Sequence, residues 1–160
     1  MKNVPEKYIG DKSADTLRAA VENQAKWLYY LTVEGMERGL SGKFAEDAMR
    51  ELGEYYADTE YLDCHTPKAL AGKLMRRSME LGHEAEISVL GEEGFDLTIG
   101  YCPMVHMWSE LTEDTERIRV LCGAACSMYE GIAGKKGMHV ERTAAIAQGC
   151  GSCCLKFRKG

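Results

Sequence analysis

The sequence lacks the features that would assign it to several large classes of protein. It has only three prolines among 160 residues. A composition of 45% hydrophobic and 28% charged residues excludes a low-complexity or disordered chain. The formal net charge is -5 and no basic face is apparent, which argues against a nucleic-acid partner. No apolar run approaches the ~20 residues of a membrane span, and no secretion signal is recognisable. We therefore expect a single cytoplasmic domain over residues 1–160, with neither a membrane nor nucleic acid as partner.

The motifs of the common enzyme classes are also missing. The chain has no phosphate-binding loop, dinucleotide fingerprint, Ser-His-Asp order or His-Glu-x-x-His helix. It is instead rich in cysteine, with seven such residues. In a reducing compartment, clustered thiols indicate metal binding or catalysis more often than disulfides. All but Cys64 lie in the second half of the chain, at Cys102, Cys122, Cys126, Cys150, Cys153 and Cys154.

The first half of the chain has the pattern of helices. Apolar residues, among them Trp27 and Leu31, recur at helical spacing between residues 14 and 40, which predicts a helix there. A second amphipathic helix is expected to follow. A third should begin at Pro67, which suits the first helical position, and end at Gly82.

The second half alternates between strand and helix patterns. The expected elements are a β-hairpin over 84–101, helices over 102–111 and 112–132, and strands over 138–147 and 153–158. The predicted fold class is therefore α+β. A helical N-terminal region, 14–82, packs on an antiparallel sheet of about four strands that two helices interrupt. The cysteine-rich site belongs to the mixed region, 84–160.

The sharpest local feature is Cys102, which Pro103 follows directly. Proline favours the first turn of a helix, so Cys102 should occupy the N-cap, where free amides and the helix dipole stabilise a thiolate. His106 lies four residues further on, and its ring can face the same side. A thiolate with an imidazole suits a nucleophile with its base, or two metal ligands. Cys102 and His106 are therefore candidate catalytic residues.

Three further cysteines extend this site. Cys122 and Cys126 lie one helical turn apart and can ligate one ion, although their small neighbours also suit simple packing, and Cys122 is the stronger candidate. Strand alternation places Cys153 on the core face of the last strand, pointing towards Cys102. Together Cys102, Cys122, Cys126 and Cys153 form a candidate four-thiolate site for Zn²⁺ or an iron–sulfur cluster.

Several short motifs in the second half resemble a known family. They are Tyr101-Cys102-Pro103-Met104 followed by Trp108, then Leu121-Cys122, Ala147-Gln148-Gly149 and Cys153-x-Leu155-x-Phe157. In this order they resemble the L-2-amino-thiazoline-4-carboxylic acid hydrolase-like family. The ending also resembles the small-molecule-binding domain related to 4-vinyl reductase. The resemblance implies opening of a thiazoline ring by water, with Cys102, Cys122 and Cys153 in a shared pocket between the sheet and the helices.

Three functions stay open on the sequence. The first, which we favour, is a hydrolase that opens a C=N or C–S bond of a small sulfur-containing heterocycle, with Cys102 as nucleophile or as ligand of a water-activating metal. The second is a redox or structural protein that holds Zn²⁺ or an iron–sulfur cluster. The third is a non-catalytic domain that binds a small molecule. A homodimer is compatible with the exposed cysteine-rich turn.

Overall fold

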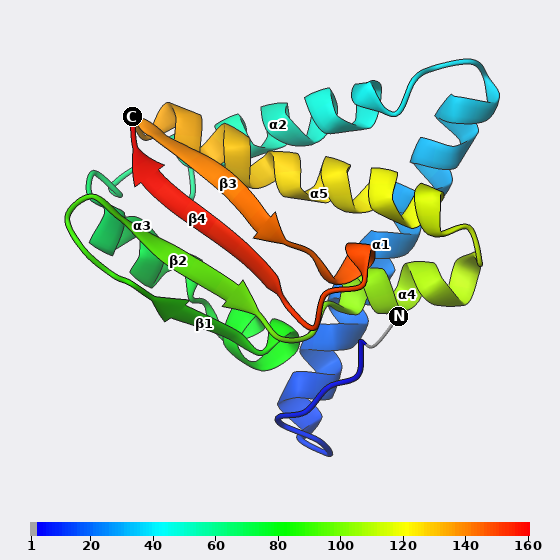
Figure 1. The fold of residues 1–160 in the computed structure, drawn as a ribbon, viewed down its shortest axis with the longest axis horizontal. Helices are drawn as coiled ribbons and strands as arrows, with labels where there is room; N and C mark the ends of the chain where they lie inside the picture. Colours follow the sequence, from blue (N-terminus) through cyan, green and yellow to red (C-terminus); the bar gives the residue numbers. More distant parts are fainter. Residues whose placement is uncertain (1–2) are drawn as a thin grey trace.

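The chain forms a set of helices that pack on a four-stranded sheet (Figure 1). The computed structural model describes residues 3–160. In chain order its elements are α1 (Lys12–Glu37), α2 (Lys43–Asp58), α3 (Pro67–Leu74), the π-helical turn η1 (Ser78–Gly82), β1 (Ala85–Ser88), β2 (Gly94–Ile99), α4 (Pro103–Leu111), α5 (Thr115–Lys135), β3 (Met138–Ala144), the 3-10 turn η2 (Ile146–Gln148) and β4 (Cys153–Lys159). This confirms the predicted α+β class, with a helical N-terminal region and two helices that interrupt the sheet.

The third helix is shorter than the sequence predicts. It was expected to reach Gly82, but it ends at Leu74, because Met75 leaves the helical region with a ψ of 54°. The chain resumes as the π-helical turn η1, and His83 follows it directly. The ring of His83 folds back onto this turn, with Nδ1 at 3.2 Å from the carbonyl oxygen of Ser78. The break therefore determines where the His83 ring lies.

The sheet has the strand order β1-β2-β4-β3, and all its pairs are antiparallel. Phe95 and Phe157 lie opposite each other on β2 and β4, are fully buried, and stack with ring centroids 4.5 Å apart. β3 ends at Ala144, earlier than predicted, because its register with β4 shifts after Arg142. The buried face of the two central strands consists of Phe95, Leu97, Ile99, Cys153, Leu155 and Phe157. Cys153 therefore lies on the core face, as expected.

The backbones of α2 and α5 approach closely where they cross. A Cβ atom on Gly53 would overlap the carbonyl oxygen of Met128, and one on Gly131 would overlap that of Arg50. Only glycine allows two backbones to come this near. The pair of glycines therefore fixes α5 against α2, with the cysteines of α5 held on the side towards the sheet.

α1 makes its main helix contact with α4 and leaves one of its own faces uncovered. Trp108 on α4 is buried, and its Nε1–H donates to the carbonyl oxygen of Ala25 at 2.9 Å. Trp27 and Leu31, by contrast, are 69% and 66% exposed. These two residues stay exposed because α2 packs on α5 and does not cover this face of α1.

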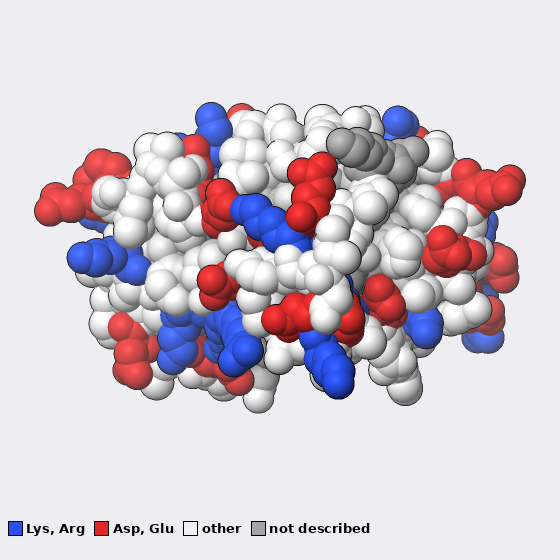
Figure 2. Space-filling model, turned by 90° about the horizontal axis from the view of Figure 1, so that it is seen from below, with Lys and Arg blue, Asp and Glu red and all other residues white. Residues whose placement is uncertain are grey.

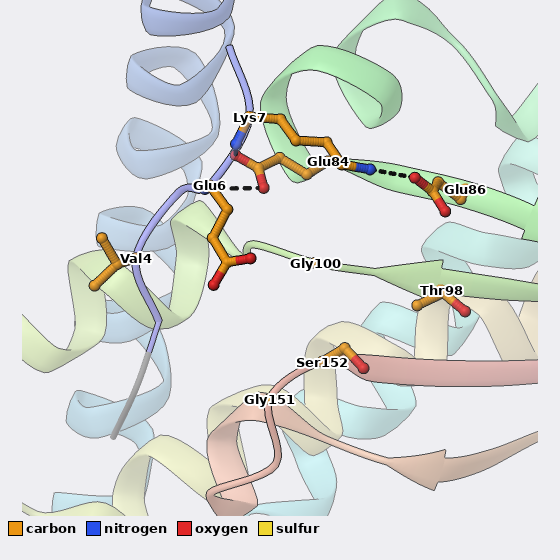
Figure 3. Close-up of a pocket in the computed structure, with 9 residues that line it drawn as sticks. All are labelled: Val4, Glu6, Lys7, Glu84, Glu86, Thr98, Gly100, Gly151 and Ser152. Atoms are coloured by element: carbon orange, nitrogen blue, oxygen red, sulfur yellow. Dashed lines mark hydrogen bonds and ion pairs between the residues drawn. The ribbon is translucent and has the colours of Figure 1, made fainter. Parts of the chain in front are cut away.

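Glu84 attaches the N-terminal segment to the start of the sheet (Figure 3). Its carboxylate accepts hydrogen bonds from the backbone N–H of Glu6 at 3.1 Å and of Lys7 at 2.9 Å. It also accepts one from Nη2 of Arg18 at 3.0 Å, in an ion pair whose side chains are 8% and 3% exposed. The neighbouring pair between Lys7 and Glu86 lies at the surface. The buried pair is therefore the main tie between this segment and the fold.

The surface carries charges of both signs. Figure 2 shows acidic and basic side chains intermixed on one face of the molecule, without a continuous basic region among the described residues. Within residues 3–160, none of the helices combines the length and the apolar character that crossing a membrane requires.

Candidate active site

A cavity of about 540 Å³ lies among α1, α2, α4, α5 and the buried face of the sheet. Most of its wall is apolar. Cys102, Cys122, Cys126 and Cys153 all line it, from the start of α4, from α5 and from β4. The structure thus brings together the four cysteines that the sequence predicts as one site.

Cys102 occupies the N-cap of α4, as predicted. Its backbone is held by Asn3, whose Oδ1 accepts from the Cys102 N–H at 3.0 Å and whose Nδ2 donates to its carbonyl oxygen at 2.9 Å. Burial nevertheless raises the pKa of the Cys102 thiol to about 12, against the hydrogen bonds from the amides of Val105 and Met104 that favour the thiolate. Desolvation outweighs the helix terminus, so Cys102 is a neutral thiol and not the activated one that its position predicts.

Cys122 and Cys126 form a hydrogen-bonded thiol pair on one face of α5, and Arg142 reaches this pair from β3. Arg142 Nη1 donates to Sγ and to the carbonyl oxygen of Cys122, each at 3.4 Å. The hydrogen bond from Cys122 and the charge of Arg142 lower the pKa of Cys126 to about 7, although burial opposes ionisation. The pKa of Cys122 is raised by the same hydrogen bond and by burial. The two thiols therefore share one proton once the pH exceeds about 7, and the lowered pKa makes Cys126 the member of the pair that ionises first.

Cys153 closes the cavity on the sheet side. Its Sγ accepts a hydrogen bond from the backbone N–H of Ile146 at 3.2 Å. Burial is the main cause that raises its pKa to about 11, so this thiol is also neutral. Cys154, the next residue along β4, is half-buried and is not part of the cavity wall.

The histidine that lines the cavity is His83, and not the predicted His106. His106 is not among the residues that line the cavity, and its ring lies near that of Tyr101, with centroids 6.1 Å apart. His83, to which the sequence assigned no role, lines the cavity. Since Nδ1 contacts a carbonyl oxygen, this nitrogen carries the proton and Nε2 keeps its lone pair. Burial lowers the pKa of His83, so the ring is neutral at pH 7 and its Nε2 can accept a proton.

Cys126 also borders a second, more polar space. A depression of about 250 Å³ lies among α2, α5, β3 and β4, and both Cys126 and Leu155 line it as well as the cavity. The Cys126 side chain therefore lies at the boundary between an apolar and a polar compartment. The charged residues of the depression are Glu46, Arg50, Glu130 and Arg142.

Within residues 3–160, Arg142 is the cation of this depression for which no carboxylate partner is found. Arg50 pairs with Asp47 at 3.0 Å and with Glu130 at 2.8 Å. Arg142 hydrogen-bonds to α5, and no carboxylate among the described residues forms an ion pair with it. The sequence analysis did not identify this residue, although the alternation of β3 places Arg142 on the same half-buried face as Val140. An arginine on the inward face of a strand was the available signal.

The prediction of a Zn²⁺ or iron–sulfur site is not supported. Within residues 3–160, no group of three or more His, Cys, Asp or Glu side chains is placed to hold a metal ion. The four thiols are distributed around the cavity wall and are engaged by protein donors, as when Cys122 accepts from Arg142 and Cys153 accepts from the Ile146 amide. Each is thus part of the packed wall.

The family of the chain follows from a comparison over nearly its full length. The family model described as L-2-amino-thiazoline-4-carboxylic acid hydrolase matches residues 7–157. The chain belongs to this family. The match confirms the resemblance seen in the second half and extends it over the helical first part, which the sequence motifs did not cover. Curated protein sequences give no match to this chain.

A solved structure of another protein has the same fold as this chain. It is trafficking protein particle complex subunit 3 from Naegleria fowleri, covalently bound to palmitic acid. Its TM-score is 0.62 and its sequence identity 14%, over 88% of this chain and 95% of that chain. At this identity the likeness establishes a common fold for this chain and that protein, and nothing about its function.

Proposed function

We propose that this protein hydrolyses a thiazoline-type ring, with Cys126 as the nucleophile and Arg142 as the residue that binds the substrate carboxylate. The observation that carries the proposal is the position of Cys126 beside both Cys122 and Arg142, where the cavity meets the polar depression. The thiolate is the nucleophilic form of cysteine. Among the four thiols of the cavity, Cys126 has its pKa lowered towards neutrality, while burial raises the pKa of Cys102 and of Cys153.

The first step is addition of the Cys126 thiolate to the ring carbon that lies between nitrogen and sulfur. The new S–C bond forms as the π pair of C=N moves to nitrogen, which takes a proton from Cys122. The C=N bond then re-forms, nitrogen returns the proton to Cys122, and the ring C–S bond breaks with sulfur leaving as a thiolate. The product of this step is an imidothioester on Cys126.

Water completes the reaction. His83 Nε2 takes one proton from water while the oxygen adds to the same carbon, and His83 passes that proton to nitrogen. The carbonyl then forms, the Cys126 thiolate leaves, and the remaining water proton goes to the departed ring sulfur. One ring and one water become an amide and a thiol, and the enzyme returns to its starting state.

Arg142 has N–H groups that remain available to bind the substrate. A guanidinium carries five N–H groups, and the hydrogen bonds to Cys122 use a single nitrogen. The remaining fork matches a carboxylate and is not engaged by a carboxylate of the described chain. A carboxylate bound there from the side of the depression would place the adjoining ring beside Cys126.

Turnover of a thiazoline-4-carboxylate by the purified protein tests this proposal. We expect wild type to release a free thiol, and Cys126→Ser to lose at least about a hundredfold in kcat, since a serine hydroxyl is not ionised near pH 7. Cys154→Ser, at a half-buried cysteine of β4 outside the cavity, is the matched control and should retain wild-type turnover. Equal turnover in all three proteins would refute Cys126 as the nucleophile.

A second candidate is a non-catalytic domain that holds an apolar ligand. The observation in its favour is the mostly apolar wall of the cavity. The protein of the same fold that is covalently bound to palmitic acid supports it as well. Saturable binding of an apolar ligand, together with no turnover of any thiazoline by wild type, would favour this function over hydrolysis.

A further inference from the structure

We infer that the preferred substrate carries an apolar chain on the ring carbon between nitrogen and sulfur. The chain lies in the cavity, while the carboxylate lies in the polar depression. This inference rests on the proposed function and specifies its substrate class. Four observations carry it: the size of the cavity, its lining, its opening, and the position of Cys126.

The cavity is much larger than a bare thiazoline carboxylate. Its volume of about 540 Å³ lies within the range of pockets that enclose drug-sized ligands, about 300 to 1,000 Å³. A five-membered ring with a carboxylate would leave most of this space empty. An apolar cavity holds ordered water poorly and can bind apolar molecules, so the remaining volume suits an apolar substituent.

The wall of the cavity is suited to a flexible alkyl chain. Leu28 and Leu52 line it from α1 and α2, and four methionines contribute from different elements, Met49, Met79, Met104 and Met128. Methionine is unbranched and adaptable, so it accommodates chains of varied shape. The polar groups of the wall, His83 among them, are too few to solvate a polar ligand of this volume.

The cavity reaches the surface on the side of α1. Trp27 and Leu31 line it and are 69% and 66% exposed. Large apolar side chains left exposed at the edge of an apolar cavity are typical of a ligand-binding mouth. A substrate chain longer than the cavity can therefore continue past these two apolar residues.

Cys126 sets the orientation of such a substrate. It lines the apolar cavity and the polar depression together, and Arg142 lines the depression and not the cavity. A ring held beside Cys126 with its carboxylate towards Arg142 has its opposite side towards the cavity. The substituent on the carbon that Cys126 attacks therefore extends into apolar space. By the steps above, the released product would be a cysteine that carries the chain as its N-acyl group.

The direct test is a series of thiazoline-4-carboxylates whose 2-substituent grows from methyl to decyl. Each buried methylene contributes about 0.8 kcal/mol, so kcat/KM should rise about fourfold per added methylene until the cavity is full. A profile that is flat or falling from methyl upwards would overturn the inference. If the methyl compound were still hydrolysed in that case, the proposed function would stand without it.

Two variants test where the apolar chain of the substrate lies. Ala125 lines the cavity from α5, so Ala125→Leu should shift the optimum to shorter chains. Tyr30→Ala is the matched control, since Tyr30 is 62% exposed on α1 and does not line the cavity. Its chain-length profile should equal that of wild type. An unchanged optimum in a folded Ala125→Leu protein would contradict the placement of the chain.

A binding measurement distinguishes failure of this inference from failure of the proposed hydrolysis. The protein has two tryptophans, Trp27 and Trp108, and both line the cavity, so its intrinsic fluorescence reports whether the cavity is occupied. If no thiazoline is turned over, the same series is titrated against Cys126→Ser. Affinity that increases about fourfold per methylene would support the apolar chain even though the hydrolase proposal fails. Affinity independent of chain length would overturn the inference.

Discussion

Arg142 donates a hydrogen bond from Nη1 to Sγ of Cys122 at 3.4 Å, and so joins β3 to the thiol pair of α5. This contact places a positive charge, free of any described carboxylate partner, beside two thiols one helical turn apart. The consequence falls on Cys126, whose pKa is lowered towards neutrality. The reactivity of the site therefore depends on a strand and a helix that only the tertiary fold brings together.

The first prediction concerns the pH dependence of thiol alkylation. Because the thiolate reacts and the pKa of Cys126 is lowered to about 7, its alkylation rate should rise with pH through about 7 and level off above it. Cys102 and Cys153, with pKa values raised to about 12 and 11, should react slowly over this range. Mass spectrometry of peptides after brief iodoacetamide treatment measures each site.

Removal of the Arg142 charge should move this profile. The groups that act on Cys126 are Cys122 and Arg142, which favour its thiolate, and Glu130, which opposes it. Arg142→Gln should therefore raise the pKa of Cys126 by about one unit, the low end for a neighbouring opposite charge, and slow its alkylation about tenfold below pH 7. Arg119→Gln, in an exposed ion pair on the same helix as Cys126, should leave the profile unchanged. An unaltered profile in Arg142→Gln would show that this charge does not set the pKa.

The two histidines give a second prediction. His83 lines the cavity with Nε2 available, so His83→Gln should reduce kcat by about a hundredfold, the lower range for loss of a general base. His106→Gln should leave kcat near wild type, because that ring is outside the cavity wall. The opposite ranking in steady-state assays would restore His106 as the base that the sequence alone predicts.

A third prediction concerns the crossing of α2 and α5. Gly131→Ala would place a methyl group against the Arg50 carbonyl oxygen, and should reduce the free energy of unfolding by about 1 to 3 kcal/mol, as overpacking does. Gly134→Ala lies three residues further along the same helix with open space around it. It should be neutral or stabilise by up to about 1 kcal/mol. Urea denaturation of both variants measures the difference, and equal effects would contradict the close crossing.

The fourth prediction concerns the tie of the N-terminal segment. Glu84→Ala leaves Arg18 buried without its partner, and should reduce the free energy of unfolding by about 3 to 5 kcal/mol. Glu86→Ala removes only the exposed partner of Lys7 and should change it by less than about 1 kcal/mol. Thermal unfolding of the two variants distinguishes a buried ion pair from a surface one, and a mild effect at Glu84 would disprove its role.

Local sequence patterns predicted the elements well and the site in part. Alternation along β4 placed Cys153 on the core face, and Pro103 placed Cys102 at a helix start, because both signals act over a few residues. The pKa of Cys102 could not be read in this way, since burial by distant elements outweighs the helix terminus. His83 enters the cavity through a break after Leu74 that helical periodicity did not reveal.

The central claim is that Cys126 bonds covalently to the substrate. The most direct measurement mixes enzyme with a thiazoline-4-carboxylate, quenches with acid within the first turnover, and maps the adduct by mass spectrometry. The account predicts one added substrate mass on the peptide that contains Cys126, absent in Cys126→Ser. An adduct on Cys102, or full turnover by Cys126→Ser, would contradict it.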